Sequence, residues 1–437
     1  MGFFGFLDFR SIPIESMSVT SKMALTPEIK DFFSGLYKSV KDRAKAVAPD
    51  MMSPTFPVWG LLLFVVVLIG LSIYYFKATR LFETAPNINR IAKASVQAQI
   101  AYGNANVNRK GIREYLQKIK SEGVPDSHLS LTNFYISTVN AAGLFYPVEN
   151  GVASPEAART AILAGARAFV FDIWPDLTPG AEFGPCIQFV ESGSLWRRIS
   201  MNSLPFASVL KALVQEAFEL DMRPGYYDPL ILYLRFRGKP RVDTYNLTAS
   251  AIGAILEPYR LDTSFNNCRS QDSLFSTPIT DLFRKVIIIS NTRAETSVLN
   301  DYINIGPRDG IKFEWGANEA RGLTTEGVKE QSRKIKQNLT MVAPLSEEPA
   351  AEQNNWSFKT AQDLGIQMCA MNFWNTNDAL KAYMAPDMFG VQSFKMKPEP
   401  LRYVIELLPI PKMPQNPGWG SGTTAGTPTK PKEIQLP

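Results

Sequence analysis

The longest hydrophobic run of the chain covers residues 56–76 and contains no charged residue: FPVWGLLLFVVVLIGLSIYYF. About 20 apolar residues, at 1.5 Å of rise per residue, are enough to cross the hydrocarbon core of a bilayer. Trp59 and Tyr74 lie near the two ends and Lys77 follows, as is typical of a helix anchored at both membrane interfaces. A buried core helix is the alternative, but uncharged runs of this length favour the membrane. The pattern predicts one transmembrane helix at 56–76.

The preceding segment, residues 1–55, contains an amphipathic pattern. Thr26-Pro27-Glu28 has the residue types that begin a helix. The apolar residues that follow are spaced as on one helical face: Ile29, Phe32, Phe33, Leu36, Tyr37 and Val40. Such a helix lies either on a membrane surface or against another protein. Gly2 is the residue that myristoylation modifies, but Phe6 stands where its motif requires Ser or Thr.

After the hydrophobic run the pattern becomes polar and helix-prone over residues 77–132, which predicts a stalk. From residue 133 onward, short apolar runs alternate with helical stretches. The expected strands are Phe134–Ser137, Ala168–Ile173, Cys186–Phe189, Leu230–Leu234, Val286–Ser290 and Gln367–Asn372, and the expected helices include Pro155–Ala164 and Phe206–Glu219. Strands that alternate with helices predict an α/β fold, a parallel (β/α) barrel of the TIM type.

Two polar segments modify this barrel. Residues 292–355 are rich in charged and small polar residues, and we expect a linker that divides the barrel into residues 133–291 and 356–403. Residues 404–437 are rich in Pro, Gly and Thr and cannot form a core. The expected architecture is a distorted TIM-type (β/α) barrel, split by a linker, with an N-terminal transmembrane helix and an extended Pro-rich tail.

Composition narrows the possible functions. The chain has 46 basic and 41 acidic residues, so its formal charge of +5 does not indicate a nucleic-acid partner. Cys186, Cys268 and Cys369 lack the spacing of a metal site or a disulfide framework. His128 is the single histidine, so mechanisms that need two histidines are excluded. We therefore predict no metal and no cofactor.

Five stretches resemble, in the same order, the barrel of eukaryotic-type phosphoinositide-specific phospholipase C, with its X half, linker and Y half. They are Asn133–Leu144, Gly165–Trp174, Asp228–Arg235, Ile279–Ser290 and Gly365–Trp374, and the last is followed by Phe394-Lys-Met-Lys-Pro-Glu-Pro-Leu-Arg402. The resemblance covers residues 133–403, and the Y-half stretches are the most specific.

The resemblance implies that the chemistry of the family is absent. The family cleaves a lipid phosphodiester with two histidines and a calcium ion. Its first histidine falls on Asn140 and the neighbouring calcium-binding asparagine on Ala141. A one-residue shift would place that asparagine on Asn140 and the histidine on Val139. Neither alignment provides an imidazole.

The remaining functional positions of the family differ in the same way. One member of its acidic pair falls on Val170, and only Asp172 is kept. The second histidine falls near Glu191, the glutamate that ends the fourth expected strand falls on Arg235, and the phosphate-contacting arginine on Met341. We therefore expect no catalytic residue by the family's mechanism. Asp172 and Glu191 remain as a carboxylate pair, but an ion pair of Asp172 with Arg235 or Arg167 is favoured.

Three functions follow from these observations. The favoured one is a membrane-anchored structural or interaction protein. It resembles the phospholipase-like proteins of large DNA viruses, which implies a minor capsid protein that links the inner membrane of a virion to its capsid. Its partners would be the lipid bilayer and other structural proteins, including capsid proteins. The second is a phosphoinositide-binding module that holds an anionic head group through Arg235, Arg237 and Lys239. The third is an active phosphodiesterase that uses Asp172 and Glu191.

Overall fold

The computed structural model describes only part of the chain. It covers Lys38, residues 63–74 and most of 109–404, with gaps at 146–150, 176–183, 189, 192–196, 199, 201, 221–222, 269–270, 294–295, 308–312, 317–331, 333 and 344–354. The chain forms two compact units, residues 1–80 and 81–437. The amphipathic helix expected after Thr26, apart from Lys38, and the Pro-rich tail beyond residue 404 lie outside the described residues.

In the first unit, residues 63–74 are helical and lie within the hydrophobic run. Their large apolar side chains are 41–59% exposed, from Val66 to Phe64. The rest of the run from 56 to 76 lies outside the described residues. In the part of the chain that the structure describes, no helix is long and apolar enough to cross a membrane. The transmembrane helix at 56–76 stays a prediction.

Seven parallel strands form the centre of the second unit. They are β1 (Phe134–Val139), β4 (Ala168–Pro175), β9 (Leu230–Phe236), β10 (Val286–Ser290), β11 (Glu314–Gly316), β12 (Met341–Ala343) and β13 (Met368–Met371). Their order in the sheet is β10-β9-β4-β1-β13-β12-β11. Of these seven strands, the last along the chain lies beside the first, and the other neighbours follow chain order. This is the strand order of a (β/α) barrel, and we call this unit the barrel.

The barrel has a seam between β10 and β11. A parallel bridge from Ile289 to Ile305 adds a short eighth position beside β10. Within the described residues, no backbone pairing joins Ile305 to β11. The remaining strands are β2 (Leu144–Phe145), β3 (Val152–Ala153), β5 (Pro185–Ile187), β6 (Val190–Glu191), β7 (Arg197–Arg198), β8 (Leu204–Pro205) and β14 (Phe394–Met396). All of them pair in antiparallel fashion. Among these pairs, β5 lies beside β4, and β14 lies beside β1.

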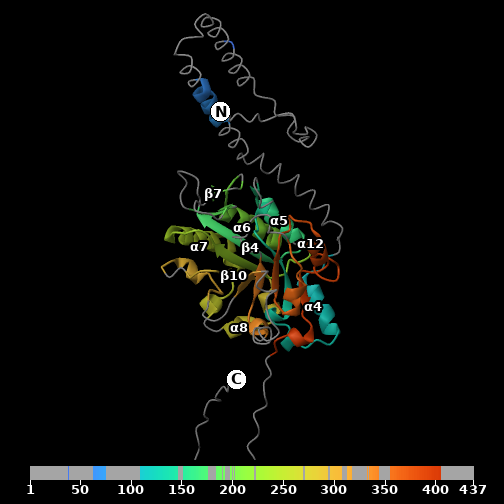
Figure 1. The fold of residues 1–437 in the computed structure, drawn as a ribbon. Coiled ribbons are helices and arrows are strands. Elements are labelled where there is room, and N and C mark those ends of the chain that lie inside the picture. The colour runs from blue at the N-terminus through green and yellow to red at the C-terminus, as the bar shows by residue number, and fades with distance from the viewer. Residues whose placement is uncertain are drawn as a thin grey trace, which may run out of the picture. The chain divides into compact units, whose positions relative to one another are not determined.

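Helices pack around the strands, most of them on the outside of the barrel. They are α4 (Ile112–Ser121), α5 (Pro155–Leu163), α6 (Phe206–Val214), which continues as the π-helix η5 (Gln215–Glu219), α7 (Val242–Leu256), α8 (Gln271–Ser276), α11 (Lys359–Asp363) and α12 (Asp378–Tyr383). The short 3₁₀ helices are η3 (Asp126–His128), η4 (Leu131–Asn133), η6 (Glu257–Tyr259), η7 (Thr263–Cys268), η8 (Ile279–Leu282), η9 (Val298–Asp301) and η11 (Glu399–Leu401). In Figure 1, α7 and α12 flank the strands from opposite sides.

The core follows the alternation of side chains along each strand. In β4, Phe169 and Phe171 belong to a cluster with residues of α5 and α6 on the outside of the sheet. Ala168 and Val170 belong to a second cluster, formed by inward-facing residues of the strands such as Tyr233. A third cluster packs α11 and α12 against the outer face of β12 and β13. The hydrophobic runs thus build a filled barrel interior as well as its outer layers.

The expected strands agree well with the structure, whereas two domain boundaries differ. Residues 292–355, expected to be a linker, contribute β11 and β12 to the barrel. These strands have three residues each, too few to produce a recognisable periodicity. Residues 109–132, expected to belong to the stalk, include α4, whose Ile112, Leu116 and Ile119 are buried in the interior cluster. The expected strand Cys186–Phe189 is the short antiparallel β5.

Lys397 is a buried lysine at the end of β14, and its replacement is expected to stabilise the protein. The side chain is 0% exposed, and Nζ has no hydrogen-bond partner among the described residues. Burial and nearby Lys336 lower the pKa of Lys397 well below its ordinary value of 10.5. The unfolded chain therefore binds more protons, so stability rises with pH up to about 10.5.

We expect Lys397→Met to raise the free energy of unfolding at pH 7 by about 1–3 kcal/mol, the usual cost of a buried polar group without a partner. It should also remove that rise of stability with pH. Urea denaturation of the full chain between pH 6 and 10 measures both effects. Lys211→Met, at an exposed position of α6, is the control and should change stability by less than about 0.5 kcal/mol. The amine lies 5.9 Å from the centre of the Tyr135 ring, and a loss of stability in Lys397→Met would show that such contacts outweigh the cost of burial.

Candidate functional site

A group of charged and amide side chains lies inside the barrel, mostly at the carboxyl ends of its strands. Asn140 follows β1, Asp172 lies in the second half of β4, Arg235 lies near the end of β9, and Asn372 follows β13. Glu314 is the first residue of β11 and approaches the same place from across the seam. In barrels of this architecture the carboxyl end of the strands is where active sites lie. We call this group the mouth network.

Arg235 is the centre of the mouth network. Its Nε and Nη2 donate to the two carboxylate oxygens of Asp172 at 2.7 and 3.0 Å. Nη1 donates to Oε1 of Glu314 at 2.7 Å, and Nη2 also donates to Oδ1 of Asn140 at 3.1 Å. Arg237 Nε donates at 2.9 Å to Oδ1 of Asp172, the oxygen that also accepts from Arg235 Nε. The Arg235 side chain is 1% exposed, so it is surrounded by protein and bonded to both acids.

The register of two strands explains this contact. Asp172 in β4 is the direct neighbour of Arg235 in β9. Two residues earlier, Val170 and Tyr233 belong to the interior cluster, and side chains two residues apart lie on the same face of a strand. Both charged side chains therefore point into the barrel. A bidentate arginine–carboxylate pair follows from this geometry.

Further hydrogen bonds hold the network from outside. The Tyr233 hydroxyl donates to Oε2 of Glu314 at 2.8 Å, so both oxygens of that carboxylate accept a bond. Asn140 Nδ2 donates to Oδ1 of Asn372 at 2.9 Å. The backbone N–H of Asn372 in turn donates to Oδ1 of Asn355 at 2.6 Å. These bonds fix the orientation of the groups that contact Arg235.

Electrostatic interactions at the mouth shift the pKa values of Asp172, Arg235 and Tyr233. Burial alone would raise the pKa of Asp172, but Arg235 and Arg237 outweigh it and lower the pKa below its ordinary value of 3.8. Burial would lower the pKa of Arg235, but Asp172 and Glu314 raise it above its ordinary value. Burial and Glu314 raise the pKa of Tyr233. These three groups therefore do not exchange protons near pH 7.

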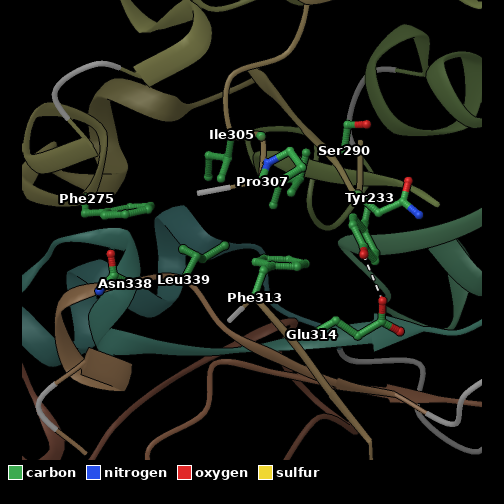
Figure 2. A pocket seen from close by; sticks show the side chains of 12 residues that line it. Tyr233, Phe275, Ser290, Ile305, Pro307, Phe313, Glu314, Asn338 and Leu339 are labelled. Carbon is green, nitrogen blue, oxygen red and sulfur yellow. Dashed lines mark hydrogen bonds between the residues drawn. The ribbon is translucent and has the colours of Figure 1, made fainter. Parts of the chain in front are cut away.

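A cavity of about 200 Å³ lies at the seam, next to the network. Figure 2 shows the bond between Tyr233 and Glu314 at one end of this cavity and Phe275 at the other. Its walls between them are mostly apolar, with Ile305, Pro307, Phe313 and Leu339 among the lining residues. The cavity therefore offers apolar contact beside a carboxylate whose two oxygens already accept hydrogen bonds.

The structure brings together Asn140, Asp172, Arg235 and Arg237 among the residues singled out from the sequence. The predicted ion pair of Asp172 with Arg235 is confirmed, whereas Arg167 pairs with Asp228. Four other singled-out positions take no part in the hydrogen bonds described above: Ala141 has a left-handed φ of 45°, Val170 and Met341 are buried, and Lys239 is exposed. The side chain of Glu191 lies outside the described residues.

The sequence analysis did not identify Glu314 and Asn372, which belong to the network, or Tyr233, which bonds to Glu314. Tyr233 and Asn372 lie in stretches that resemble the phospholipase family, and each is an even number of residues from an inward-facing position of its strand. That spacing was a usable signal for both. Glu314 lies in the segment expected to be a linker, and no local pattern distinguishes it from the other acids there.

An acid-sensitivity experiment tests the role of Asp172. Because its pKa in the folded chain is lowered, its contribution to stability is complete above about pH 4 and is lost as the pH falls through the lowered value. We expect wild-type stability to fall in this acidic range. Asp172→Asn should be less stable at pH 7, and its stability should depend less on pH below 4. Urea denaturation at a series of pH values measures this difference. Parallel pH profiles for the two proteins would contradict it.

Comparison with known proteins gave matches only among solved structures. No protein-family model and no curated protein matches the chain. PLC21 of L. pealei is 18% identical with a TM-score of 0.48, and the match covers 63% of this chain and 38% of that one. For PLC21 of S. officinalis the identity is 17%, the TM-score 0.49 and the coverages 64% and 39%. For the phosphatidylinositol-specific phospholipase C of Listeria monocytogenes they are 12%, 0.34, and 59% and 94%.

The chain spans about two fifths of the length of the two PLC21 proteins that it matches. A calcium-dependent phosphoinositol-specific phospholipase C of a Pseudomonas species is also similar, at 10% identity and a TM-score of 0.37. Each of these TM-scores is below 0.5. The assignment of a barrel-like fold therefore rests on the strand order described above and not on these matches. Both bacterial structures named here are phospholipases C specific for phosphoinositol or phosphatidylinositol.

Proposed function

We propose that this chain is a membrane-anchored structural or interaction protein, built on a phospholipase-C-like barrel that does not catalyse hydrolysis. The observation that carries the proposal is the position of Arg235. This guanidinium group occupies the barrel mouth and is bonded to both Asp172 and Glu314. A cation is thus already present where an enzyme of this type would bind a metal ion and a phosphodiester.

The donor set at the mouth does not fit a calcium ion. Calcium takes six to eight oxygen ligands, several of them carboxylates. Asp172 and Glu314 are the carboxylates of the mouth network, and their oxygens accept hydrogen bonds from Arg235, Arg237 and Tyr233. A calcium ion would have to displace a buried guanidinium group of the same sign. The residues present therefore stabilise the barrel instead of creating a metal site.

Three ionisable groups at the mouth are poorly suited to proton transfer at neutral pH. General acid–base catalysis works best with a pKa near the operating pH. The pKa values of Asp172, Tyr233 and Arg235 are all shifted away from neutrality. His128 precedes β1, and its Nδ1 lies 3.4 Å from Nη1 of Arg402. Both observations support a barrel that does not catalyse hydrolysis by acid–base chemistry.

The helix at residues 63–74 supports the membrane part of the proposal. Its apolar side chains are exposed around the whole helix, and a helix that is hydrophobic on all sides is stable where it is surrounded by lipid or protein. The uncharged run that contains it has the length of a bilayer core. We infer that residues 56–76 anchor the barrel to a membrane.

A hydrolysis assay tests the loss of catalysis. The full chain, in a neutral detergent, is incubated at high concentration with phosphatidylinositol 4,5-bisphosphate and calcium, and release of inositol phosphate is measured. The phospholipase C of L. monocytogenes, assayed on phosphatidylinositol, serves as the positive control for detection. We expect no release above buffer. Calcium-dependent release that persists after repurification and disappears in Asp172→Asn would overturn the proposal and favour the phosphodiesterase hypothesis.

A narrower form of the proposal places the protein in the virion of a large DNA virus, where it links the inner membrane to the capsid as a minor capsid protein. The resemblance of the sequence to phospholipase-like proteins of such viruses supports it. Quantitative mass spectrometry of purified particles tests this form, with detection at a constant copy number as the expected result. Absence of the protein from those particles would refute the virion role and leave the general proposal unaffected.

Binding of an anionic head group is the second candidate function, and one observation favours it. Arg237 Nη2 is buried without a hydrogen-bond partner among the described residues, and nearby Lys239 is exposed. Arg235 is fully engaged, so Arg237→Gln is the informative variant. Under this hypothesis, the variant binds liposomes containing phosphatidylinositol 4,5-bisphosphate at least fivefold more weakly than wild type. Equal binding of both proteins would reject it.

A further inference from the structure

A second, smaller cavity lies at the opposite end of strands β4 and β9. Its volume is about 70 Å³, and its lining includes Arg109, Arg167 and Arg223. Arg167 immediately precedes β4, and Gly225 of the lining lies five residues before β9. The mouth network, in contrast, lies toward the carboxyl ends of the same strands. The two sites are therefore separate.

Two of the cations at this cavity already have acidic partners. Arg167 Nε lies 2.8 Å from Oδ2 of Asp228. Arg223 forms an ion pair with Glu216. Gly225 provides the space for the first pair, because its φ is 90° and a Cβ there would overlap the Arg167 guanidinium and the Asp228 carboxylate. Asp228 and Glu216, the two acids in these pairs, each already have an arginine partner.

Arg109 is a third guanidinium at the same cavity, and it forms no ion pair among the described residues. Its Nη1 is buried and has no hydrogen-bond partner among the described residues. The group lies directly over Gly165, whose φ is 95° and whose missing side chain leaves the space that Nη1 occupies. Lys110 lines the cavity as well, and neither it nor Arg109 has an acidic partner in the part of the chain that the structure describes.

The surroundings of Arg109 indicate a missing negative charge. Burial and the neighbouring Arg167 lower the pKa of Arg109 to about 10, and the opposing effect of Asp228 does not make up for them. The carbonyl oxygens of Ile162 and Ala166 at this end of α5 accept hydrogen bonds from Arg167 instead. In addition, the π-helix η5 begins beside the cavity and places Glu216 and Ala217 in its lining. Such widened turns occur frequently at functional sites.

We propose that this cavity binds one phosphate-sized oxyanion, held by Arg109 and Lys110 beside Arg167. Guanidinium groups present paired N–H donors that match the oxygens of phosphate. A bound dianion would supply the charge that the two unpaired cations lack. The ligand is either free phosphate or the phosphoryl group of a phosphomonoester, because both present the same oxygens to the cavity.

Isothermal titration calorimetry on the full chain in neutral detergent tests this site. Inorganic phosphate and glycerol 3-phosphate are titrated separately at constant ionic strength. We expect saturable binding of one phosphate per chain and at least tenfold weaker binding in Arg109→Gln. Comparable binding of glycerol 3-phosphate to wild type, lost in the same variant, would assign a phosphomonoester. Binding of phosphate alone would assign the free ion.

Lys211→Gln is the matched control, because it removes one positive charge at an exposed position of α6. It should bind phosphate as wild type does. Thermal denaturation without phosphate shows whether Arg109→Gln is folded, and phosphate should raise the melting temperature of wild type and of the control more than that of the variant. Heats of dilution only for wild type, or equal affinity in wild type and folded Arg109→Gln, would overturn the proposal.

Discussion

Replacing Arg235 with methionine is expected to lower the free energy of unfolding by about 3–5 kcal/mol, the usual effect of removing one partner of a buried ion pair. Methionine replaces the aliphatic part of the side chain but has no charge, so Asp172 and Glu314 would lose the guanidinium that bonds to both. Asn140 would lose a hydrogen bond as well. Asp172 would retain Arg237, which limits the loss. Urea denaturation of the full chain, followed by tryptophan fluorescence, measures the effect.

A triple variant separates the loss of a partner from the loss of packing. In Arg235→Met/Asp172→Asn/Glu314→Gln the side chains that faced Arg235 are neutral, so most of the lost stability should return. Arg159→Met is the control, because its pair with Glu156 lies on the surface of α5 with the two side chains 34% and 29% exposed. That change should cost less than about 1 kcal/mol. An Arg235→Met effect as small as that of the control would mean that the mouth network does not support the barrel.

The parts of this network that the sequence predicts are those with a local pattern. The strands β4 and β10 are apolar runs with short helical or turn segments on either side, and their positions are predictable within two residues. The pairing of Asp172 was predictable too, but with two possible arginines. Arg167 precedes β4 and lies five residues from Asp172 along an extended strand. This separation excludes a contact between their side chains within one strand, so Arg235 is the remaining candidate partner of Asp172.

The seam of the barrel was not predictable in this way. Glu314 contacts Arg235 from a strand of three residues in a polar segment, and no periodicity of its own marks that strand. Its position is determined by pairing with β12 and by packing inside the barrel, which are long-range interactions. The burial of α4 was not predictable either. Its apolar residues lie on one face, and they are buried because they pack on interior residues of the barrel strands, which are distant in sequence.

Asp228→Ala is expected to be about as destabilising as Arg235→Met, again by about 3–5 kcal/mol. Asp228 is 0% exposed and connects two parts of the barrel. Its Oδ2 accepts from Arg167 Nε at 2.8 Å, and its Oδ1 accepts from the backbone N–H of Ile112 at 2.7 Å. Ile112 is the first residue of α4, so this carboxylate caps a helix that is distant in sequence.

Two measurements distinguish these roles of Asp228. A double-mutant cycle with Arg167→Met gives the energy of the ion pair, which should lie between about 0.5 and 3 kcal/mol. Amide hydrogen exchange reports the cap: exchange at Ile112 should be faster in Asp228→Ala and unchanged in Arg167→Met. Asp126→Ala is the control, because Asp126 is 78% exposed and pairs with Lys120 on the surface. If Asp228→Ala has no larger effect than this control, α4 does not depend on Asp228 for its attachment to the barrel.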